Sequence, residues 1–152
     1  MRGCPKKIDG ELWLENCNKL ENIDYFPEQI RDLTIGKCGE LINLKGIENT
    51  YVDSGISLEN LYILTLRYFP KCNSDCNIII EELNVIDSLI GIPKEIGTLG
   101  LYYCSKINNI NDIHHIKRRL SIYGCPQIFI NDVKKKMKDV KGQVIFEGDE
   151  LK

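Results

Sequence analysis

The chain has 152 residues, of which 43% are hydrophobic and 28% charged, the balance of a globular protein that can bury one core. A formal net charge of −2 gives it no general attraction for nucleic acid or for an anionic membrane. No apolar run has the length of a membrane-spanning helix or of a secretion signal. We therefore expect a cytoplasmic protein that binds neither membrane nor nucleic acid.

The amino-acid usage is strongly biased. The chain contains 23 Ile, 15 Lys and 13 Asn and no Ala, which follows the codon preference of an AT-rich genome such as that of a giant virus, a phage or an AT-rich microbe. Because this bias supplies Asn and Lys throughout, their abundance is not interpreted as a binding signature.

A segment near the N-terminus is repeated along the chain. Residues 12–23 and 33–44 share the repeated apolar positions and the cysteine at an offset of 21 residues, and residues 99–107 and 120–128 repeat the match at the same offset. The shared pattern is L-x-L-x-x-C-x-x-L, and four copies in one register indicate a repeating structural unit. Its cysteines are Cys17, Cys38, Cys104 and Cys125.

Each part of this pattern has a structural meaning. Two leucines separated by one residue lie on the same side of a strand, so L-x-L predicts a short strand with one buried face. The cysteine falls in the following turn, where a small side chain can pack inside and hydrogen-bond weakly to free backbone groups. One unit cannot bury its own apolar face, so the units are expected to stack and their strands to form a parallel sheet.

The pattern resembles the leucine-rich repeat family, in the form that carries Cys where Asn is usual. The resemblance implies an α/β solenoid, a short arc with a parallel sheet of about six or seven short strands on its concave side and a mostly irregular or short-helical convex side. We expect a single domain over 1–152, with an N-terminal cap at about 1–11, repeats at about 12–130 and a C-terminal helical or strand cap at about 131–152.

Strands are expected to begin at residues 12, 33, 64, 83, 99 and 120, with a weaker seventh at 144–146. The third and fourth rest on Leu64-Thr65-Leu66 and Leu83-Asn84-Val85, which lack the cysteine. The wide gap between the second and third strands predicts an insertion at 48–60.

The segments between strands are expected to be mostly irregular. Pro27 and Pro93 fall in two of them, and proline removes an amide donor and disfavours helix just before it. A helix is expected at 132–140, with Asp132 as its N-cap and Val133, Met137 and Val140 on one stripe. This helix would cap the solenoid.

The seven cysteines raise the question of disulfides or metal. The four in the repeat are expected to be buried, reduced and unpaired, and the odd total agrees with a reducing compartment. Cys72 and Cys76 form C-x3-C, but zinc would need two further ligands and no second pair follows at finger spacing. We expect no metal and no cofactor.

No arrangement of residues predicts catalysis. His114 and His115 are the two histidines and are expected on the convex surface, and no nucleophile or phosphate-loop motif occurs. The basic runs 117–119 and 134–138 could contact phosphates, but they are expected to form solvated surface. We expect no enzyme.

The exposed positions of the predicted strands are rich in aromatic residues. Tyr and Trp, together with Arg, dominate the energetics of protein interfaces. We therefore expect a non-catalytic protein–protein interaction module, with a host protein as its partner if the source is a virus or phage. The alternative is a structural protein that self-associates through the solenoid. The expected binding residues are Trp13, Arg67, Tyr68, Tyr102, Tyr103 and Tyr123.

Overall fold

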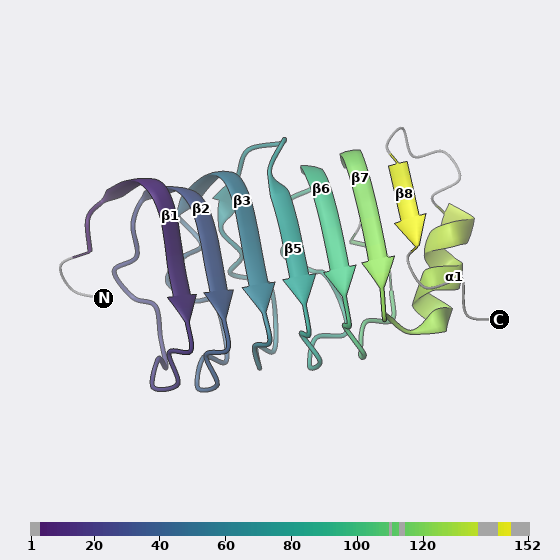
Figure 1. The fold of residues 1–152 in the computed structure, drawn as a ribbon, viewed down its shortest axis with the longest axis horizontal. Helices are drawn as coiled ribbons and strands as arrows, with labels where there is room; N and C mark the ends of the chain where they lie inside the picture. Colours follow the sequence, from purple (N-terminus) through teal and green to yellow (C-terminus); the bar gives the residue numbers. More distant parts are fainter. Residues whose placement is uncertain (1–3, 110, 113–114, 137–142, 147–152) are drawn as a thin grey trace.

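The computed structural model describes residues 4–109, 111–112, 115–136 and 143–146 (Figure 1). The chain winds into a solenoid of about six turns along one eight-stranded sheet, in which all paired strands are parallel. The strand order is β1-β2-β3-β5-β6-β7-β8, and β4 pairs with β3 off this path. The elements are β1 Lys7–Glu15, β2 Gln29–Gly36, β3 Tyr51–Glu59, β4 Lys71–Cys72, β5 Asn77–Glu81, β6 Glu95–Tyr102, β7 His115–Tyr123, α1 Gln127–Lys136 and β8 Gln143–Phe146.

The repeated apolar residues hold the sheet in register. The first apolar residue of each repeat pairs with its counterpart in the next strand, and these side chains form one column of the core. The strands expected at 12, 33, 99, 120 and 144 are confirmed, although the first four begin several residues earlier. Consequently residues 7–11, which were expected in the N-terminal cap, belong to β1. The column consists of Leu12, Leu33, Ile56, Ile78, Leu99 and Leu120.

The middle of the sheet differs from the sequence prediction. Residues 64–66 and 83–85 are not strands, and the expected insertion at 48–60 contains β3, with β5 following at 77–81. These turns carry Leu61 and Leu83 at the position of the repeat cysteine, and both are buried. The inward position therefore requires a buried apolar side chain rather than a thiol.

The return segments follow a different rule from the strands. In several of them a buried residue recurs at every third position, and its N–H donates to the carbonyl of the residue three before it. Examples are Leu41 to Cys38 (3.1 Å), Phe69 to Leu66 (2.9 Å) and Ile92 to Leu89 (3.1 Å). Leu66 therefore belongs to a return, which explains why Leu64-Thr65-Leu66 is not a strand despite its alternation.

A left-handed residue directly follows the strand in each of the first six repeats. It stands immediately before the inward Cys or Leu, and in the first five repeats its N–H donates to a carbonyl of the next strand in the sheet. The left-handed conformation costs energy for residues other than glycine. The same backbone hydrogen bond offsets this cost in successive repeats. The residues are Asn16, Lys37, Asn60, Glu82, Tyr103 and Gly124.

The repeat cysteines are free thiols, as expected, and so are the other three cysteines. Cys38, Cys104 and Cys125 are buried, whereas Cys17 is only half-buried because it lies in the outermost turn. The Cys38 sulfur lies within hydrogen-bond distance of the carbonyl oxygens of Gly36 (3.2 Å) and Leu14 (3.5 Å), which belong to two neighbouring turns, and its one S–H can donate to either.

The C-terminal end of the solenoid is covered by α1 and β8 (Figure 1). Phe129 and Val133 of α1 enter the core, and the Lys134 ammonium lies 4.9 Å from the centre of the Phe146 ring. The helix begins at Gln127, so Asp132 lies inside it and is not its N-cap. Met137 and Val140, expected on the same stripe, lie outside the described residues.

Leu101→Ala should lower the free energy of unfolding by about 2–5 kcal/mol, because Leu101 is fully buried between neighbouring turns. Ile79→Ala is the matched control, since Ile79 lies on the exposed side of β5 and its loss should cost about 1 kcal/mol or less. Urea unfolding measures both. Equal losses in the two variants would contradict the assigned strand faces.

Candidate functional site

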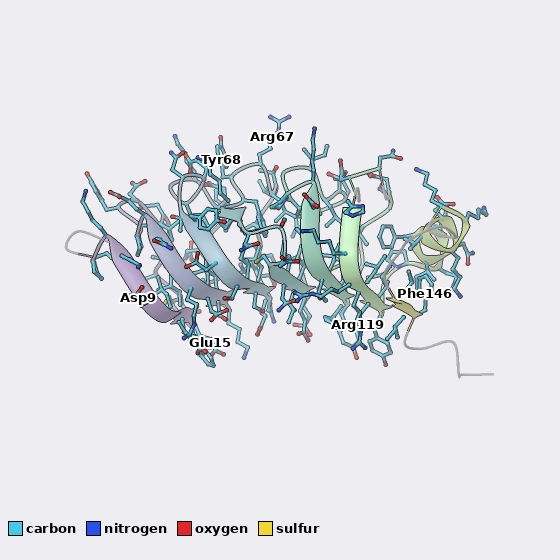
Figure 2. The ribbon with its side chains drawn as sticks, turned by 90° about the horizontal axis from the view of Figure 1, so that it is seen from above. Asp9, Glu15, Arg67, Tyr68, Arg119 and Phe146 are labelled. Carbon is cyan, nitrogen blue, oxygen red and sulfur yellow. The ribbon has the colours of Figure 1, made fainter. Side chains whose placement is uncertain are left out.

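One face of the sheet is open to solvent. The residue between the two core residues of each strand points to this face, which we call the open face. Trp13 is 63% exposed there and Ile79 39%, whereas the equivalent Gly100 of β6 and Ser121 of β7 are buried. Figure 2 shows Glu15 and Arg119 on one side of the molecule and Arg67 and Tyr68 on the other. No helix among the described residues is long and apolar enough to span a membrane.

Three tyrosines gather at the C-terminal ends of β6 and β7. Tyr102 and Tyr123 are direct partners in the register of the two strands. Tyr103, which is 45% exposed, meets Tyr123 edge to face with ring centres 4.9 Å apart. We call these three residues the tyrosine cluster, and it joins three of the six residues expected to bind a partner.

Two glycines make room for the tyrosine cluster. A Cβ on Gly100 would lie 2.6 Å from the Tyr102 ring, so this ring covers the backbone of its own strand. Gly124 has a φ of 64°, and a Cβ there would lie 2.5 Å from the Tyr103 ring. A larger residue at either position would displace a ring, so the rings can occupy these positions only because both residues are glycine.

Carboxylates border the tyrosine cluster. The pKa of the Tyr103 hydroxyl is raised, mainly by hydrogen bonding with Tyr123. The negative charges of Glu81 and Glu82 raise this pKa further. Glu59, Glu81, Tyr102 and Tyr123 occupy one row, because each is the register partner of the next on neighbouring strands. The rings therefore adjoin an acidic part of the open face.

The sequence prediction missed these acidic residues because it misplaced the middle strands. The signal was present in Ile56-x-Leu58-x-x-Leu61 and in Ile78-x-Ile80-x-x-Leu83. Both segments fit the repeat once Leu is accepted at the cysteine position.

Trp13 lies on the open face but far from the tyrosine cluster. It belongs to β1, four ladder steps from β6, which corresponds to about 19 Å. Its indole N–H donates to Glu11 (3.1 Å). It borders a shallow hollow of about 210 Å³. The residues that line this hollow include Asp32, Thr34, Gly55, Ser57, Asn77 and Ile79.

Arg67 and Tyr68 do not lie on the sheet, which corrects their expected place on a strand. They stand in the return segment after β3, on the side opposite Glu15 and Arg119 (Figure 2). The physical reason is the three-residue spacing of the return, which places Leu66 and Phe69 in the core. Between them Arg67 is exposed, and Tyr68 is half-buried against the core. They cannot contribute to one surface with the tyrosine cluster.

The basic run at the start of β7 is largely engaged within the protein. Lys117 donates to Ser74 (2.7 Å) and lies within 4 Å of Asp75 and Glu95. Arg118 donates to the carbonyl of Asp75 (2.5 Å), across Gly97. His115 is exposed at the start of the same strand, and His114 lies outside the described residues.

Cys72 and Cys76 interact with each other. Cys72 is half-buried and Cys76 is fully buried, so Cys72 is the more accessible thiol. A hydrogen bond from Cys76 lowers the pKa of Cys72, and the same bond together with burial raises the pKa of Cys76. No group of three or more His, Cys, Asp or Glu among the described residues is arranged to hold a metal ion.

These features define a class: a solenoid repeat protein with a parallel sheet, whose one face is open and carries a tyrosine cluster beside carboxylates. A search with this chain finds no matching family model, no similar curated protein and no similar solved structure.

In native protein near neutral pH, iodoacetamide should modify Cys72 before Cys76. The lowered pKa of Cys72 gives it more thiolate at any pH below its ordinary value, and its side chain is the more accessible of the two. Mass spectrometry of the digested protein measures both sites over time. Equal rates, or faster modification of Cys76, would contradict the assigned hydrogen bond.

Proposed function

We propose that this chain is a non-catalytic interaction module of the leucine-rich repeat type, which binds a protein partner in the cytoplasm through its tyrosine cluster. The observation that carries the proposal is the position of these rings on the open face of a continuous sheet. If the source is a virus or phage, a host protein is the expected partner. The proposal assigns no catalytic residue, metal or cofactor.

The physical basis of the proposal is the low cost of ordering these rings. Tyr103 already contacts Tyr123, and Tyr102 lies over Gly100, so little side-chain entropy remains to be lost on binding. Tyrosine rings can bury a large apolar area while their hydroxyl groups still form hydrogen bonds. A protein partner is favoured over nucleic acid because Glu81 and Glu82 beside the rings would repel phosphates.

Replacing Tyr102 and Tyr123 together by Ala should weaken partner binding at least about tenfold, or roughly 1.4 kcal/mol, because it removes two rings of the contact surface. Affinity capture from cell lysate with quantitative mass spectrometry should show proteins retained by the wild type and lost by this variant. The matched control is Tyr25→Ala with Tyr62→Ala, which removes two exposed tyrosines from return segments.

Circular dichroism is the control that checks whether both double variants are folded. Retention of the same proteins by the folded Tyr102 and Tyr123 variant, or equal loss in the Tyr25 and Tyr62 control, would contradict the proposed surface.

A structural role through self-association is the second candidate, and the N-terminal end of the solenoid favours it. The outer side of β1 pairs with no strand among the described residues. Side chains that are buried in later turns are only half-buried here. Such an edge can pair with a strand of another chain. The half-buried residues are Ile8, Leu12, Leu14, Cys17, Leu20 and Phe26.

Features of the same edge oppose pairing, so we expect a monomer of 17.5 kDa. Lys7 is exposed, and the register shift between Ile8 and Glu11 interrupts the regular ladder. Charged residues and bulges discourage pairing between sheet edges. Size-exclusion chromatography with light scattering, over a wide range of protein concentration, measures the mass. A stable dimer or larger species would favour the structural role.

A further inference from the structure

The charge of the open face is unevenly compensated. Near β1 and β2, Glu15 pairs with Lys37 (3.0 Å), and Arg31 lies within 4 Å of Glu11 and Asp32. Each of these three acidic groups is therefore in an ion pair with one of two basic groups on the same face.

The acidic residues beside the tyrosine cluster form no such salt bridge among the described residues. Glu59 accepts a hydrogen bond from Ser57 (2.8 Å), and Glu82 accepts one from Asn60 (2.9 Å). These donors are neutral, and no salt bridge joins Glu59, Glu81 or Glu82 to a basic residue in the described part of the chain. We call these three residues the carboxylate group. The charges of Glu59 and Glu82 help to raise the pKa of Lys37, but Lys37 already pairs with Glu15. One shared ammonium cannot neutralise three carboxylates, so the group keeps a net negative charge.

From this arrangement we infer that the partner presents an extended, arginine-rich segment, which lies across the strands over the carboxylate group and the tyrosine cluster. The inference rests on the proposed function and specifies the chemistry of its partner. Guanidinium groups suit both halves of the surface, because their planar fork pairs with carboxylates and their face stacks on aromatic rings. An ammonium group offers a point charge alone and would use the rings less well.

The geometry sets the length of the segment. Glu59, Glu81, Tyr102 and Tyr123 follow one another across neighbouring strands, three steps that span about 14 Å. An extended chain places side chains on one face about every 7 Å. A segment of about five residues with alternating arginines would therefore reach from Glu59 to Tyr123.

Fluorescence anisotropy with labelled nona-arginine tests the inference, with nonalysine and a neutral glycine–serine peptide of the same length as comparisons. The wild type should bind nona-arginine several-fold more tightly than nonalysine, and the neutral peptide should not bind. The affinity should fall as the salt concentration rises, because the carboxylate charges are exposed to solvent.

The triple variant E59Q/E81Q/E82Q should bind nona-arginine at least about tenfold more weakly, since three charges are lost at the binding surface. The control E21Q/E40Q/D87N changes the net charge equally, at exposed positions of the return segments, and should retain the wild-type affinity within about twofold. Tyr102→Ala with Tyr123→Ala should also weaken nona-arginine binding. Circular dichroism is the control that checks whether each variant is folded.

Equal weakening in the two triple variants, or no binding of nona-arginine by the wild type, would overturn the inference. The lysate experiment separates this failure from failure of the proposed function. If capture of lysate proteins still requires Tyr102 and Tyr123 while nona-arginine does not bind, the proposed function is supported and its partner is not a basic segment. If nona-arginine binds through the carboxylate group but no captured protein depends on the tyrosines, the proposed protein-binding surface fails.

Discussion

The structure depends on one constraint: after each strand the chain must reverse direction and send an apolar side chain back into the core. A left-handed residue achieves this, and its N–H bonds to a carbonyl of the next turn in all but the last such repeat. The inward side chain that follows, Cys38 or Leu61 for example, is buried against its neighbours. Because one turn supplies both the hydrogen-bond acceptor and the packing surface for another, a single repeat has no stability alone.

This constraint explains which parts of the fold could be predicted from the sequence. The repeats with Cys38 and Cys104 were recognisable because a rare residue marks the inward position. Leu61 and Leu83 meet the same requirement, but they do not stand out among many other apolar residues. The alternation of Leu64 and Leu66 resembles a strand, whereas the three-residue period of the return decides their environment.

Because the middle strands were misplaced, part of the candidate site was also predicted wrongly. Tyr102, Tyr103 and Tyr123 were placed together correctly because they belong to repeats whose register the cysteines fix. Arg67 and Tyr68 were assigned to a strand that does not exist, while Glu59 and Glu81 were overlooked on strands that do. The contact of Tyr103 with Tyr123, and the covering of Gly100 by Tyr102, depend on ring orientations that no sequence pattern specifies.

Along each strand, side chains point alternately to the core and to the open face, so different residues determine stability and binding. Leu99 and Leu101 are buried on β6, whereas Tyr102 directly follows them on the open face. A substitution at an open-face position leaves the core column intact, so the chemistry of that face can change without loss of the fold. A shift of one residue in register would exchange the two sets and would bury Glu59 and Glu81 in an apolar interior at a large free-energy cost. The register that keeps these carboxylates in water therefore also aligns them with the tyrosine rings.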